Sequence, residues 1–215
     1  SSVKTATLAP EAGSQRLRDI INKKLDESTI LSCVRRFVLA GIPNLRLYFM
    51  VGLPHELPAD VDAIVDLTLR IKETFLESSR IKKRIGTITL SINPFIPKPA
   101  TPFQWAPMMK IPQLKQRLER IQKQLKTVAN VKVQTESLKQ ARINALLSRA
   151  DRQVSHLIET AADTSWSRAL KANAGSCETV IHARHPLDGP LPWDFIDSGV
   201  DKAFLAREFG QAAEE

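Results

Sequence analysis

The stretch LYFMVGLPHELPADVDAIVD, from Leu47 to Asp66, decides the fold class of this 215-residue chain. Its apolar first half ends in Gly-Leu-Pro, and an acidic segment with helical spacing follows. This is the pattern of a strand that enters a tight turn and then a helix. The near-continuous apolar run predicts a strand buried on both faces, as in parallel sheets.

Outward from this unit, strand-like and helix-like segments alternate. We expect strands over residues 3–8, 44–54, 86–92 and 131–137, and helices over 15–24, 29–41, from Asp60, from Pro112 and over 138–163. Ser14, and Asp26 or Ser28, are the expected helix caps. Alternation of this kind predicts an α/β fold with a parallel sheet and helical crossovers.

Three unusual turns fall where predicted strands end. They are APEAGS, GLPHE and the proline-rich NPFIPKPATPF. Ligands of such sheets bind outside the carboxyl ends of the strands, so the three turns are expected to meet at one ligand face. Each turn also has a structural explanation. Glu11 could contact ribose hydroxyls or cap a helix, Ser14 could cap or contact a ligand, and Gly52 with Pro54 could simply make a tight turn. The proline-rich loop could be a pocket wall, a cover for the open side of the barrel, or both.

Composition narrows the function classes. Apolar residues make up 43% of the chain, and no window is long and apolar enough to span a membrane. The net charge is +8, and residues 78–126 carry eleven basic side chains against one acidic one. This basic middle is compatible with RNA as a partner or with a solvated helix face. Cys33 and Cys177 have no metal-ligand spacing and form no disulfide framework, which favours a reducing cytoplasm. Because no apolar window is long enough to span a membrane, we expect no membrane partner. A zinc site from HARH, residues 182–185, with Cys177 is the weaker alternative.

The segments TLAPEAGSQRLRDIINK, LRLYFMVGLPHE and SINPFIPKPATPFQW, with the tail LPWDFIDSGVDKAFLAREF, together resemble one family. They look like the second half of the radical S-adenosylmethionine (SAM) enzyme barrel. The closest group pairs this barrel with an N-terminal cobalamin-binding-like domain. The resemblance implies a partial parallel (β/α) barrel over residues 1–135 and a C-terminal helical extension over 136–215.

The resemblance also implies site residues. Glu11 and Ser14 would contact the ribose or methionine part of SAM. Met50 and Val51 would line its adenine, and Gly52 would make the turn. Asn93, Phe95 and Lys98 would border the substrate.

The family holds a 4Fe-4S cluster on a C-x-x-x-C-x-x-C loop, and this sequence contains no such loop. We therefore expect the chain to be the C-terminal portion of a larger radical SAM enzyme, with no catalytic or metal-binding residue of its own and no activity alone. The parent would cleave SAM reductively, with methyl or methylthio transfer and cobalamin as candidates.

Two partners follow from this interpretation. The N-terminal half of the same polypeptide is the first, and a second copy, paired at the exposed edge of residues 3–8, is the other. A non-catalytic RNA-binding or scaffold module is the alternative function.

Overall fold

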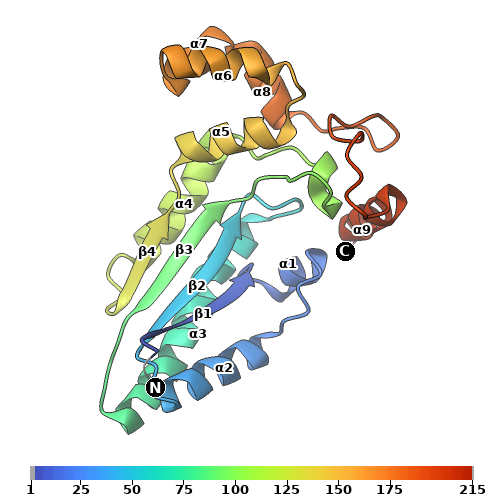
Figure 1. The fold of residues 1–215 in the computed structure, drawn as a ribbon. Coiled ribbons are helices and arrows are strands. Elements are labelled where there is room, and N and C mark those ends of the chain that lie inside the picture. Colours follow the sequence, from blue (N-terminus) through green and yellow to red (C-terminus); the bar gives the residue numbers. More distant parts are fainter. Residues whose placement is uncertain (1–2, 215) are drawn as a thin grey trace. The chain divides into compact units, whose positions relative to one another are not determined.

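A computed structural model describes residues 3–214 of the chain, which divide into two compact units (Figure 1). The first unit contains the chain up to Pro94 together with Pro112–Glu136, and the second contains Phe95–Ile111 and Ser137–Glu214. The boundary near residue 136 lies one residue from the predicted one. The proline-rich segment groups with the C-terminal helices.

The first unit is built on a four-stranded parallel sheet whose strands pair in chain order, β1-β2-β3-β4. The strands are β1 (Thr5–Glu11), β2 (Asn44–Val51), β3 (Ile88–Pro94) and β4 (Val131–Thr135). The helices that connect them are α1 (Gln15–Ile20), α2 (Glu27–Leu39), α3 (Pro58–Lys82) and α4 (Ile111–Leu125).

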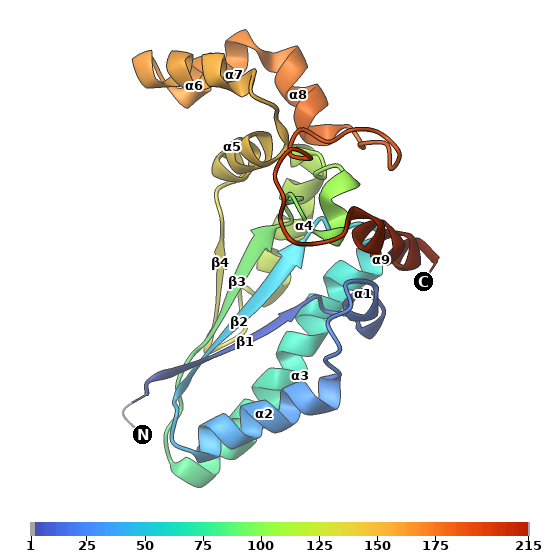
Figure 2. The ribbon, with the colours of Figure 1, turned by 45° about the vertical axis from the view of Figure 1, so that its right-hand side comes forward.

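Sequential pairing fixes where the helices lie. Crossovers between parallel strands are right-handed in nearly all sheets, so a run of crossovers in one direction puts every helix on the same face. In the two views α2 and α3 lie side by side along the sheet (Figures 1 and 2). The fold is therefore the predicted α/β class, a partial (β/α) barrel with a helical C-terminal extension.

The two faces of the sheet differ in burial. In β2 the buried side chains are those of Leu45, Leu47, Phe49 and Val51, and the residues between them are partly exposed. β3 alternates in the same way. The prediction that β2 is buried on both faces was wrong, because Arg46 and Tyr48 lie on the second face, within a nearly apolar run. In a complete barrel this more polar face would line the interior.

Local sequence signals were sufficient to predict several helix ends. Ser14 and Asp26 cap α1 and α2 by accepting hydrogen bonds from the main-chain N–H groups of Leu17 and Thr29. Gly41, with a φ of 88°, follows the end of α2. α3 begins at Pro58, two residues before the predicted start, because proline suits the first helical position.

The second unit is helical. It contains α5 (Leu138–Arg149), α6 (Val154–Asp163), α7 (Trp166–Ala172), α8 (Ala174–His182), α9 (Lys202–Glu214) and a short 3-10 helix over Pro102–Trp105. The predicted single helix over 138–163 is two helices, because the chain is extended at Ala150. The helices α7 and α8 lie in a part of the chain for which we predicted no element. A small core joins Trp105 and Ala106 to Leu191, Leu205 and Phe209.

Among residues 3–214, no helix has both the length and the apolar character that a membrane crossing requires.

Candidate functional site

Three of the predicted site residues lie together where the strands of the first unit end. Glu11 is in register with Phe49 of β2, and Met50 is in register with Asn93 of β3. Because the strands are parallel, these ends form one edge of the sheet. Glu11, Met50 and Asn93 are all partly exposed, and Met50 and Asn93 alternate with buried neighbours. The carboxyl edge of the sheet is thus the candidate ligand site of this unit.

Glu11 stands out in its backbone. The register of β1 against β2 shifts between Leu8 and Glu11, and Glu11 has a φ of 66°, in the left-handed region. Irregular pairing and left-handed residues other than glycine are enriched near functional sites. The Glu11 carboxylate lies 3.3 Å from the Lys23 ammonium. It therefore stands at the sheet edge as a partly exposed, charged acceptor.

The turn after Met50 is stabilised by a hydrogen bond from its own main chain to a buried carboxylate. Gly52, with a φ of 82°, donates its main-chain N–H to Glu56 Oε2 at 2.9 Å. Arg117 of α4 donates to the other carboxylate oxygen of Glu56 at 2.6 Å. The Glu56 side chain is 1% exposed, and burial raises its pKa despite the hydrogen bonds from Arg117 and Gly52. The Gly52 N–H is therefore already engaged and is not free for a ligand.

Val51 is fully buried on the helix-covered face of the sheet. Its side chain cannot line an adenine at the carboxyl edge, so any contact from Val51 would come from its main chain. For a ligand at this turn, the structure leaves the Met50 side chain on the partly exposed face.

Ser14 acts first as a structural residue. Its hydroxyl caps α1 and donates to Asp60 Oδ1 at 2.5 Å. Asp60, 4% exposed, also accepts from the main-chain N–H of Leu57 at 2.7 Å and forms an ion pair with Arg16. Burial raises the pKa of Asp60, but the hydrogen bonds from Ser14, Leu57 and Arg16 outweigh it and hold the pKa below its usual value. The capping role of Ser14 is confirmed, and a ligand contact stays a prediction.

The sequence predicted a helix start at Asp60 but no hydrogen-bonding role for Asp60 or Glu56, the two acids that fix this edge. Glu56 lies in the turn after β2 and Asp60 in the first turn of α3, four residues further along the chain. In the sequence, the only local indication of this network was the carboxylate of Glu56, four residues after Gly52. Their partners Ser14 and Arg117 are distant in sequence, so the network could not be read from the motif alone.

The predicted substrate residues fall in different units. Asn93 belongs to the first unit, whereas Phe95 and Lys98 belong to the second. Phe95 packs edge to face against Phe103, with 5.9 Å between ring centroids. Lys98 donates to the Ser148 hydroxyl at 2.8 Å. The structure therefore does not place the three residues within one unit.

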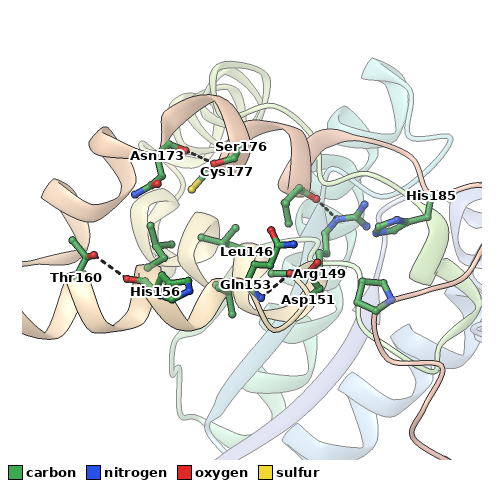
Figure 3. Close-up of a pocket in the computed structure, with 15 residues that line it drawn as sticks. Leu146, Arg149, Asp151, Gln153, His156, Thr160, Asn173, Ser176, Cys177 and His185 are labelled. Atoms are coloured by element: carbon green, nitrogen blue, oxygen red, sulfur yellow. Dashed lines mark hydrogen bonds between the residues drawn. The ribbon is translucent and has the colours of Figure 1, made fainter.

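The second unit contains a pocket of about 700 Å³ between α5, α6 and α8 (Figure 3). Buried Arg149 lies at one end and donates to the main-chain carbonyls of Val180 at 2.9 Å, of Ala183 at 2.5 Å and of Ala106. Burial lowers its pKa to about 10. Arg149 thus fastens the C-terminal end of α8 to the segment that contains Ala106, which is a structural role.

The histidines near this pocket do not form a metal site. His182 Nδ1 lies 2.8 Å from the carbonyl of Met108, and Nε2 of His185 is buried without a hydrogen-bond partner. Burial and the charge of Arg149 lower the pKa of His185, and burial raises that of the Cys177 thiol. Across residues 3–214, no group of three or more histidine, cysteine or acidic side chains could hold a metal ion.

An iron–sulfur cluster does not fit the residues in this structure. Cys33 lies in α2 of the first unit and Cys177 in α8 of the second, and both are free thiols. The described part of the chain offers no third cysteine. Any cluster of the whole protein would need cysteine ligands outside residues 3–214. We therefore assign no reaction step at such a cluster to these residues.

Comparison with known proteins finds an archaeal relative. The chain is 33% identical over 169 residues to an uncharacterized protein of the archaeon Methanocaldococcus jannaschii. The match covers 78% of this chain and 35% of that protein, so the chain spans about a third of its relative's length. No family model matches the chain, and no solved structure does either.

Proposed function

We propose that this chain is the C-terminal part of a radical SAM enzyme and that its carboxyl sheet edge forms part of the SAM site. The observation that carries the proposal is the meeting of Glu11, Met50 and Asn93 at the ends of three adjacent parallel strands. In this assignment Glu11 accepts hydrogen bonds from ligand hydroxyls, Met50 contacts the adenine, and Asn93 faces the substrate.

Two further observations support it. The strands pair in chain order, which is the arrangement of a (β/α) barrel, and the sheet face that carries Arg46 and Tyr48 is only partly buried. Met50 and Asn93 alternate along their strands with the buried residues, so they lie on this second face. A ligand at the carboxyl edge would therefore reach the face that becomes the barrel interior.

The whole protein would supply what this chain lacks. The relative is much longer than the matched region, and the proposal assigns the cluster ligands and the first half of the barrel to the remaining sequence. Reductive SAM cleavage, followed by methyl or methylthio transfer, is then the parent's proposed reaction, with cobalamin as a candidate second cofactor. The free thiols of Cys33 and Cys177 fit a cytoplasmic location.

Methionine-methyl NMR of this chain tests the site directly. The chain has three methionines, with Met50 at the sheet edge of the first unit and Met108 and Met109 in the second unit. Millimolar SAM should shift the Met50 methyl signal and leave the other two in place. Glu11→Gln should weaken the shift, whereas Ser91→Ala, on the same face as Met50 but nearer the middle of β3, should not.

The proposal fails if the Met50 signal does not respond, or if all three methyl signals shift alike. The parent reaction is tested separately on the full-length relative, prepared without oxygen and supplied with iron and sulfide. An iron–sulfur absorbance and release of 5′-deoxyadenosine from SAM on reduction are expected. A protein that binds no cluster and releases no 5′-deoxyadenosine would refute the assigned reaction.

A further inference from the structure

Opposite the ligand edge, the first unit ends in a basic tip made of residues 80–85, Arg-Ile-Lys-Lys-Arg-Ile. These residues finish α3 and begin the connection to β3. All six are exposed, and Ile81 and Ile85 are 71% and 59% exposed. The tip therefore shows four cations and two large aliphatic side chains to its surroundings.

The charge of the tip is not neutralised. The sequence has no acidic residue between Glu77 and Glu119, and Glu77 already pairs with Arg35 at 3.6 Å. Within the part of the chain that the structure describes, none of the four tip cations forms an ion pair. Lys4 and Lys126 are exposed as well and precede β1 and β4 at this same amino edge of the sheet.

The position of the tip separates it from the candidate ligand site. The seven residues of β3 run from this amino edge to the carboxyl edge, a distance of roughly 23 Å at the usual rise per strand residue. A molecule bound at the tip alone would not reach Met50 or Asn93. The tip is therefore separate from the candidate ligand site.

The side-chain types at the tip favour one class of polyanionic partner over another. Proteins that bind single-stranded nucleic acid usually stack bases on aromatic rings, and residues 80–85 contain none. Cations attract the anionic headgroups of a membrane, and exposed aliphatic side chains enter the boundary between headgroups and acyl chains. In place of the expectation of no membrane partner, we infer that residues 80–85 dock the protein peripherally on an anionic lipid surface, without crossing it.

Vesicle co-sedimentation of the whole chain tests this inference. We expect binding to vesicles that contain phosphatidylglycerol and none to pure phosphatidylcholine vesicles. Lys82→Gln with Arg84→Gln should weaken binding about twentyfold to thirtyfold, since each cation near an anionic surface contributes about a factor of five. The matched control is Lys110→Gln with Lys115→Gln, two exposed cations beside the start of α4, which should change little.

A second variant pair separates lipid insertion from charge alone. Ile81→Ser with Ile85→Ser keeps every cation and should still weaken vesicle binding at least about tenfold, because two aliphatic side chains no longer enter the lipid. Both positions are exposed, so the fold should be retained, as far-UV circular dichroism will check. Three results would overturn the inference: no vesicle binding, full binding by the isoleucine variant, or binding to mixed-sequence RNA but not to anionic vesicles.

Discussion

Replacing Asp60 by alanine should remove the hydrogen bonds and the ion pair that connect the start of α3 to α1 and to the turn before α3. The carboxylate accepts from the Ser14 hydroxyl and the Leu57 N–H and pairs with Arg16. It also lies in the first turn of α3, where the helix dipole favours a negative charge. Among the described residues, no other side chain accepts from all three of these donors.

The expected loss can be summed from these contacts. An unsatisfied Leu57 N–H costs about 1–3 kcal/mol, and the partly exposed Ser14 hydroxyl about 1 kcal/mol. Arg16 is 36% exposed, so its ion pair adds at most about 1 kcal/mol after solvent screening. We therefore expect Asp60→Ala to lower the free energy of unfolding of the first unit by about 2–5 kcal/mol.

Urea unfolding can assign this loss to the correct unit. The three tryptophans, Trp105, Trp166 and Trp193, all belong to the second unit, so their fluorescence serves as an internal reference. Far-UV circular dichroism reports on the helices of both units. The variant should shift the dichroism transition to lower urea while the tryptophan signal changes less.

Asp62 provides the matched control. It also lies near the start of α3 and pairs with Arg120, but the two side chains are 34% and 51% exposed. Asp62→Ala should therefore cost about 1 kcal/mol or less. Equal losses in the Asp60 and Asp62 variants would refute the reasoning. The folded pKa of Asp60 is lowered, so its contribution is present above the unfolded value near 4 and disappears as the pH falls through the folded pKa.

Four other perturbations test separate parts of the structure. Gly13→Ala would place a Cβ 2.2 Å from the main-chain nitrogen of Ile64, so thermal unfolding should show a loss of about 3 kcal/mol in the first unit; an unchanged melting temperature would contradict this packing. Glu56→Gln removes a group whose folded pKa is raised, mainly by burial. Relative to this variant the wild type should gain stability as the pH falls through that pKa toward about 4.3, and a flat difference across dichroism melts would contradict it. Arg149→Met leaves three carbonyls without their donor and should destabilise the second unit by about 3 kcal/mol, seen in tryptophan fluorescence. Thr7→Lys, on the edge strand β1, should reduce any self-association measured by light scattering, whereas a larger assembly would count against pairing at that edge.

Much of the first unit could be predicted because its signals are local. The stripe of Leu114, Leu118, Ile121 and Leu125 becomes the buried side of α4, as helical spacing predicts. Strand and helix alternation gave the parallel sheet, and parallel strands bring turn residues to one edge. These inferences need only neighbours in sequence and the general handedness of crossovers.

The rest depends on contacts between residues far apart in sequence. The engagement of Gly52 by Glu56 follows from a buried pair with Arg117, which lies 61 residues beyond Glu56. The helix breaks at Ala150, next to Arg149, whose side chain donates to main-chain carbonyls of two other segments. The spacing of apolar residues in the sequence does not reveal such long-range contacts. α7 and α8 are short, and each buries only two residues, so their sequence pattern is weak.

The path of the chain limits how the protein can be divided. The polypeptide leaves the first unit at Pro94, returns at Pro112 and leaves again after Glu136. A polypeptide ended at Glu136 would keep every strand but lose Leu191, Leu205 and Phe209, which bury Trp105. It would carry an uncovered indole and be prone to aggregate. Isolating the sheet therefore requires replacing residues 95–111 by a short linker as well as removing the C-terminal helices.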